Sequence, residues 1–219
     1  QRAGGRLDPV EKIGTIGSMA SSGAAESEPL WAEQAARRLL EPLGARWRHT
    51  VGVVERARIV SGALARDEAD ALVAAAYLHD VGYAPELAET GFHAVDGARF
   101  VRGCGHERLA GLVAYHSGAA AEAGERGLVR ELAEFEDERS LVSRALTFCD
   151  LTTDSEGQPV QPGDRLGEIR RRYGAAAPEV RALERSAPAL LSDLRAVEAM
   201  LAERGFRDSA LPADEVRSE

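Results

Sequence analysis

Cysteine is nearly absent from this chain of 219 residues, which holds only Cys104 and Cys149. Neither lies in a Cys-x-x-Cys spacing, which argues against a thiolate metal site and against a disulfide framework. The chain also lacks an apolar run long enough to cross a bilayer and the pattern of a secretory signal. These absences predict a protein of the reducing cytoplasm that does not span a membrane.

Lysine is scarce as well, because Lys12 is the only one and arginine supplies the other positive charges. The net charge is -9, which argues against a nucleic-acid polymer or a membrane surface as partner. An anionic ligand would need a local group of cations to offset this field. A homodimer is left open as the assembly.

The composition, 44% hydrophobic and 29% charged, is that of an ordinary globular protein with one sizeable core. Residues 1–29 are rich in Gly, Ala and Ser and are expected to form a disordered leader, in which Met19 is a candidate natural start. Residues 30–206 are expected to form the folded domain. The charged residues 207–219 are expected to be a frayed tail.

Helical periodicity runs through almost every segment of residues 30–206, and no segment alternates with a period of two. The pattern predicts an all-α fold, a single compact helical bundle. The predicted helices cover residues 30–40, 47–65, 67–79, 92–102, 107–116, 128–135, 137–151 and 165–173, with closing helices that begin at Pro178 and Pro188. Residues 119–127 are expected to be a mobile connection.

A His-Asp pair, His79-Asp80, stands at the end of the apolar run that begins at Ala76, and Gly82 is expected to end this helix. Buried ionisable groups cost free energy unless they are paired, hydrogen-bonded or bound to a metal. A divalent metal is therefore the simplest partner for this pair, provided that the chain supplies further ligands.

Helical spacing places several other ionisable side chains on apolar faces. His49, for example, shares a face with Val53, Ala57 and Val60. Taken singly, each such residue is better explained as a hydrogen-bonded core residue, or for Asp150 as a carboxylate paired with an arginine. Converging imidazoles and carboxylates, however, are typical of a transition-metal site. The inward-facing set is His49, His79, Asp80, His93, His116 and Asp150.

The order His49, then His79-Asp80, then Asp150 resembles the His…His-Asp…Asp signature of the HD-domain metal-dependent phosphohydrolase superfamily. The resemblance covers roughly residues 47–154. It implies a helical bundle of the HD-domain type and a hydrolase that depends on bound metal.

Two further stretches sharpen the resemblance. Phe92-His93-Ala94-Val95-Asp96-Gly97-Ala98 is similar to the His-x-x-x-Gly-Ala helix start of two-metal members, including HD-GYP phosphodiesterases. Leu112-Val113-Ala114-Tyr115-His116-Ser117 is similar to the Tyr-His-Thr stretch of bacterial symmetrical dinucleoside-tetraphosphate hydrolases. The chain has Tyr83 where HD-GYP proteins have Lys, and it has no Gly-Tyr-Pro motif, which argues against cleavage of cyclic dinucleotides.

Carried over residue by residue, the resemblance assigns ligands to two metal ions. It implies one ion bound by His49, His79, Asp80 and Asp150, and a second bound by His93 and His116, with Asp80 bridging. His79 and Asp80 would be the catalytic pair, and a hydroxide between the ions would be the nucleophile. The mixed ligand set favours Fe, Mn, Co or Zn over Mg or Ca.

Candidates for substrate binding follow from position alone. Tyr83 and Asp154 lie in loops next to the ligand motifs, and Arg170 begins a run of three arginines. His106 is better interpreted as an exposed loop histidine. The expected function is hydrolysis of a small phosphorylated metabolite, a nucleotide or dinucleoside polyphosphate. The alternatives are a two-iron oxygenase of the HD fold and a non-catalytic module that binds a nucleotide or metal.

Overall fold

The structure is a computed structural model, and it describes residues 27–206. Almost all of the expected leader and the whole expected tail at 207–219 lie outside the described residues. The α-helices are α2 (Glu28–Leu40), α3 (Ala45–Ser61), α4 (Arg66–Leu78), α5 (His93–Gly103), α6 (Glu107–Ala114), α7 (Ala119–Arg126), α8 (Val129–Leu132), α9 (Leu141–Leu151), α10 (Pro162–Tyr173) and α11 (Pro178–Glu203). Short 3-10 helices are η1 (Glu41–Leu43), η2 (Val81–Tyr83), η3 (Pro85–Leu87) and η4 (His116–Gly118).

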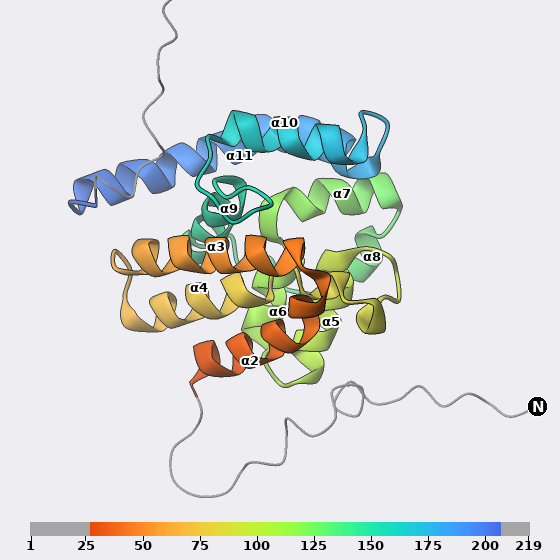
Figure 1. The fold of residues 1–219 in the computed structure, drawn as a ribbon, viewed down its shortest axis with the longest axis horizontal. Coiled ribbons are helices and arrows are strands. Elements are labelled where there is room, and N and C mark those ends of the chain that lie inside the picture. Colours follow the sequence, from red (N-terminus) through yellow and green to blue (C-terminus); the bar gives the residue numbers. More distant parts are fainter. Residues whose placement is uncertain (1–26, 207–219) are drawn as a thin grey trace, which may run out of the picture.

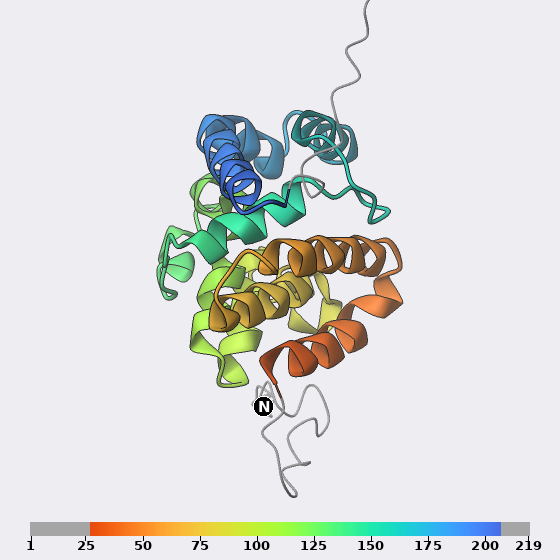
Figure 2. The ribbon, with the colours of Figure 1, turned by 90° about the vertical axis from the view of Figure 1, so that its left-hand side faces the viewer.

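The helices form a bundle in which α10 and α11 lie along one side, with α3 and α4 beneath them and α2 beyond α4 (Figures 1 and 2). Helix α9 runs between α11 and the α3–α4 pair, and it contacts both. Within residues 27–206 there is no strand, and the predicted all-α fold is confirmed. None of the helices between residues 27 and 206 has the length and apolarity needed to cross a membrane.

The core lies where α3, α4 and α9 meet. Val53, Leu72 and Leu146 are completely buried there, one from each helix. Burying such side chains contributes about 1.5–3 kcal/mol each. The apolar faces predicted from periodicity therefore point into the core, and the same faces direct the histidines inward.

Two predicted segments are wrong. The connection expected at residues 119–127 is largely helix α7, whose Ala119 and Ala123 pack in the core cluster. The two closing helices are the single helix α11, with Pro188 inside it. A proline removes one backbone hydrogen bond, but α11 is packed on both sides of Pro188, since Val180 and Ala182 are buried before it and Leu190 and Leu194 after it.

Two close backbone contacts set the geometry of the bundle around its histidines. A Cβ atom at Gly82 would lie 1.9 Å from the carbonyl oxygen of His93, so glycine lets α5 approach the end of α4. A Cβ atom at Gly52 would lie 2.3 Å from the carbonyl oxygen of Gly157, so the loop after α9 packs directly on α3. Gly82 is therefore more than the helix stop expected from the sequence.

Candidate metal centre

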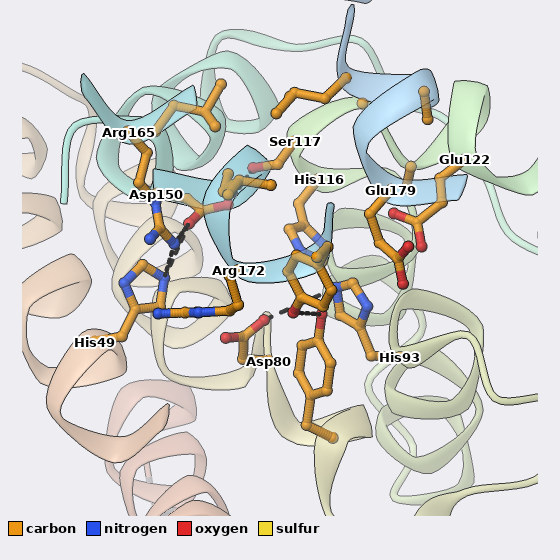
Figure 3. Close-up of a pocket in the computed structure, with 18 of the residues that line it drawn as sticks. His49, Asp80, His93, His116, Ser117, Glu122, Asp150, Arg165, Arg172 and Glu179 are labelled. Atoms are coloured by element: carbon orange, nitrogen blue, oxygen red, sulfur yellow. Dashed lines mark hydrogen bonds and ion pairs between the residues drawn. The ribbon is translucent and has the colours of Figure 1, made fainter. Parts of the chain in front are cut away.

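One cluster of ligand side chains lies at the meeting point of three helices. His49 comes from the first turns of α3, His79 caps the C-terminus of α4, and Asp150 lies near the end of α9. All three are buried, and one ligand atom from each lies within 4.8 Å of the others. We call this set the first triad. Figure 3 shows His49 and Asp150 side by side and joined by a hydrogen bond.

A second cluster lies beside the first. Asp80 follows α4, His93 is the first residue of α5, and His116 follows α6. Their ligand atoms also lie within 4.8 Å of one another, and the Nε2 atoms of His93 and His116 are 3.3 Å apart. We call this set the second triad. The structure therefore brings all six predicted ligand residues together near helix ends, with five of them lining one pocket and His79 buried beside it.

Backbone carbonyls fix the orientation of three imidazole rings. The Nδ1 atom of His79 donates to the carbonyl of Ala76 at 2.8 Å, and that of His116 to the carbonyl of Val113. The Nδ1 atom of His49 donates to the carbonyl of Asp154 at 2.9 Å. A carbonyl can only accept, so each Nδ1 carries the proton and each Nε2 is turned toward the pocket. This is how proteins orient histidines that bind metal.

The environment favours the protonation states that bind a cation. Burial lowers the pKa of His79 and of His93, which keeps both rings neutral. Burial alone would raise the pKa of Asp80, but His79 and the Arg46 guanidinium outweigh it and hold this pKa well below its usual value. The pKa of Asp150 is likewise lowered, because the hydrogen bond and charge of His49 outweigh burial.

The residues fit a divalent cation. The Nε2 atom of His79 is buried and makes no hydrogen bond within the described part of the chain, an arrangement that costs free energy unless a ligand satisfies the nitrogen. The Nε2 atom of His49 lies 3.0 Å from Oδ1 of Asp150. With the His49 proton on Nδ1, both atoms have lone pairs that can bind a metal ion. Imidazole nitrogens combined with carboxylate oxygens suit transition metals.

Arginines and tyrosines line the same pocket. Arg46 donates to Oδ2 of Asp80 at 2.9 Å and to the hydroxyl of Tyr173 at 2.6 Å. Its guanidinium also lies 3.6 Å from the centre of the Tyr83 ring, and Tyr83 in turn stacks on His93 with ring centres 4.2 Å apart. Arg165 and Arg172 complete the cationic lining.

An acidic pair lies at the other end of the pocket, toward His93 and His116 (Figure 3). Glu122 and Glu179 both pair with Arg126, the first at 2.7 Å. Burial raises the pKa of Glu122 above its usual value, because it outweighs the hydrogen bond from Arg126. The pocket therefore has an arginine beside each triad, Arg165 at the first and Arg46 at the second, and an acidic pair near His93 and His116.

Of the three candidates for substrate binding, only Tyr83 has its side chain in the pocket. Tyr83 lines the pocket. The Asp154 carboxylate instead accepts from the backbone amides of Glu156 and Gln158, and only its backbone carbonyl serves the site, through His49. Placing the Asp154 side chain in the pocket was wrong. Arg170 points away from the pocket and pairs with Glu184, because α10 turns Arg165 and Arg172 inward instead.

The sequence reasoning missed several lining residues. Arg46 was not among the candidates, although it lies three positions before His49, a spacing that puts both side chains on one helical face. Ser117 donates to Asp150, and a backbone φ of 47° at Ser117 turns the chain there. No sequence signal marks that bond, since it joins residues from two different elements.

Comparison with known proteins gives one match. The family model of the HD domain matches residues 46–153, a range that begins at Arg46 and includes both triads. No curated protein and no solved structure matches the chain. The family match, the helical fold and the paired His-Asp triads agree, and the chain belongs to the HD-domain superfamily.

Proposed function

We propose that this protein is a metal-dependent phosphohydrolase. It cleaves a phosphoester or phosphoanhydride bond in a small metabolite, a nucleotide or a dinucleoside polyphosphate. The observation that carries the proposal is the arrangement of the two triads. They meet at Asp80 and face one pocket, and arginines line that pocket. A family of metal-dependent hydrolases and a cationic pocket together favour a phosphorylated substrate.

Asp80 is suited to bridge two ions. Its Oδ2 atom lies 3.7 Å from Nε2 of His79, and its Oδ1 atom lies 3.8 Å from Nε2 of His93. We infer that His49, His79 and Asp150 hold one ion, that His93 and His116 hold the other, and that Asp80 is shared. Two divalent transition metals, such as Fe, Mn, Co or Zn, would lower the pKa of a water and offset charge on phosphorus.

The chain's own groups supply orientation and charge. Arg46 donates to Asp80 and lines the pocket, which places its charge beside the proposed metal ions and their substrate. Arginine is suited to this task because its planar fork matches phosphate oxygens. The aromatic ring of Tyr83 shields one side of His93 from water.

The test is phosphate release from a panel of nucleotides and dinucleoside polyphosphates, with each metal added in turn. Variants His79→Ala and Asp80→Ala should lose activity. His106→Ala is a matched control, because His106 stacks on Trp31 at 4.0 Å, outside the pocket. Equal activity in the wild type and in both triad variants would refute the proposal.

The same assay separates the alternatives. Hydrolysis does not need oxygen, so activity that disappears under anaerobic conditions would indicate the two-iron oxygenase instead. Binding of a nucleotide without turnover under any metal would indicate the non-catalytic module.

A further inference from the structure

Helix α10 lines the pocket with a face that carries two arginines. Arg165, Ile169, Arg172 and Tyr173 line the pocket, and their spacing places them on one side of the helix. Arg165 is the only buried residue among the 12 of α10. Burying a guanidinium costs free energy unless a charge or hydrogen bonds compensate, so packing alone does not explain it. The cationic face of α10 therefore lies against negative charge inside the pocket.

Arg165 is directed at the first triad. Its Nη2 atom lies 3.4 Å from Nε2 of His49 and 3.7 Å from Oδ1 of Asp150 (Figure 3). Its Nη1 atom donates to Glu168 at 2.6 Å, which fixes the direction of the fork. Its Nε atom is buried and makes no hydrogen bond within the described residues. The guanidinium therefore has unused donor capacity inside the pocket.

A metal ion in the first triad would share the Asp150 carboxylate with Arg165. Two positive groups about 4 Å apart in a partly dry pocket repel each other by several kcal/mol at an effective dielectric of 20. An oxyanion that touches both groups would remove this repulsion and satisfy the free donor. A tetrahedral phosphoryl group has the oxygens to do both.

We propose that Arg165 binds a non-bridging oxygen of the substrate's phosphoryl group, and that α10 is the substrate-recognition element of this protein. The inference rests on the proposed function, and it assigns the role to a helix outside the HD-domain match at residues 46–153. Substrates then need at least two free oxygens on the bound phosphorus, one for the metals and one for Arg165. Glu168 is a positioning residue, because it also pairs with Arg172 at 2.9 Å.

The test uses inorganic phosphate as the probe and the full chain loaded with metal. Calorimetry compares the wild type with Arg165→Gln, Arg165→Lys and the matched control Arg170→Gln, which alters an arginine of the same helix that is 61% exposed. We expect Arg165→Gln to weaken phosphate binding by roughly 10- to 100-fold, the loss typical of a charged hydrogen bond. Arg165→Lys should recover part of the affinity, and Arg170→Gln should bind like the wild type.

A second measurement does not depend on a variant. Hydrogen exchange of the α10 amides in the wild type should become faster when metal alone is added, because the ion repels Arg165. It should slow again when phosphate is added with the metal. Exchange in α10 that phosphate leaves unchanged would overturn the inference, even if Arg165→Gln failed to fold.

The outcomes distinguish the inference from the proposed function. If the wild type hydrolyses phosphorylated substrates while Arg165→Gln keeps full metal content, phosphate affinity and KM, the inference fails and the proposed function stands. If the metal-loaded wild type neither binds phosphate nor hydrolyses any substrate, both fail. If Arg165→Gln raises KM at least tenfold with metal content intact, the inference is supported.

Discussion

The two triads contain the same types of side chain but are held differently. In the first, all three residues are buried, and the rings of His49 and His79 are tied to backbone carbonyls. In the second, His93 is partly exposed, with 14% of its side-chain surface accessible. Its ring is held by stacking on Tyr83. One site is fixed by the backbone of the bundle, and the other depends partly on side chains at the pocket surface.

This difference predicts that the two triads bind metal with different affinities. Hydrogen bonds to ligand residues typically change metal affinity by about 10- to 100-fold. Both histidines of the first triad have such a bond, and in the second triad only His116 has one. Each triad's carboxylate also accepts a hydrogen bond, Asp150 from Ser117 and Asp80 from Arg46. We therefore expect the first triad to retain its ion firmly and the second to exchange its ion more readily. Asp80 connects the two, because one of its oxygens lies 3.7 Å from Nε2 of His79 and the other 3.8 Å from Nε2 of His93.

The largest effect should come from removing that connection. Asp80→Asn keeps the shape of the side chain but removes the charge that faces both triads. We expect kcat to fall by at least about 1000-fold, since metal catalysis is worth several kcal/mol. Hydrolysis assays with metal in excess measure this loss.

Asp193→Asn is the matched control for that substitution, because Asp193 pairs with Arg144 outside the pocket. Circular dichroism should show both variants folded. Activity in Asp80→Asn within tenfold of the wild type would mean that the triads work independently.

The wild type itself tests the difference in affinity. Protein loaded with metal and then dialysed against a weak chelator should lose the ion of the second triad first. We expect affinities that differ by roughly 10- to 100-fold, in line with the backbone hydrogen bonds of the first triad. Metal content measured against time would show two phases. His93→Gln should remove the weaker phase, and a single phase in the wild type would contradict the comparison.

The clustering of the six candidate ligands was predictable because each lies on an apolar helical face or at a helix end. Periodicity turned His49 inward, and the apolar run before His79-Asp80 marked a buried charged pair. The sequence does not specify how two helix ends meet. The contact between Gly82 and α5 that brings His93 beside Asp80 is a tertiary contact.

The pocket lining was harder to predict for the same physical reason. Arg170 was chosen because it begins a run of three arginines. The orientation of α10 instead turns Arg172 and Arg165, which lies seven positions earlier, into the pocket. Asp154 was chosen for its position in a loop, and the structure brings only its backbone carbonyl to the site, through His49. Loop residues and helix rotation depend on contacts between elements, and a single sequence contains no direct record of those contacts.

A smaller effect should come from increasing the distance between the triads. In Gly82→Ala the new methyl group would meet the carbonyl oxygen of His93 and the backbone nitrogen of Gly97, so α5 must move away. Overpacking of this kind typically costs about 1–3 kcal/mol. We expect urea unfolding to show this loss and metal analysis to show an emptied second triad with the first retained. Gly124→Ala is the control, since a Cβ there meets nothing within 4 Å. Loss of both ions would mean that the triads are not structurally separate.

The smallest effect should come from Ser117, whose hydroxyl donates to the first triad. Its hydroxyl donates to Asp150, while its backbone amide donates to Thr147 at 3.1 Å and keeps the turn in place. Ser117→Ala therefore removes one donor from the carboxylate without removing a ligand. We expect metal affinity of the first triad to fall by about tenfold, and that of the second to stay unchanged, in metal titrations of the stripped protein. Ser61→Ala, on the surface of α3, is the control. If Ser117→Ala weakened the second site instead, the order of affinity assigned to the two triads would have to be reversed, because the hydrogen bonds to Asp150 would then not be what holds the tighter ion.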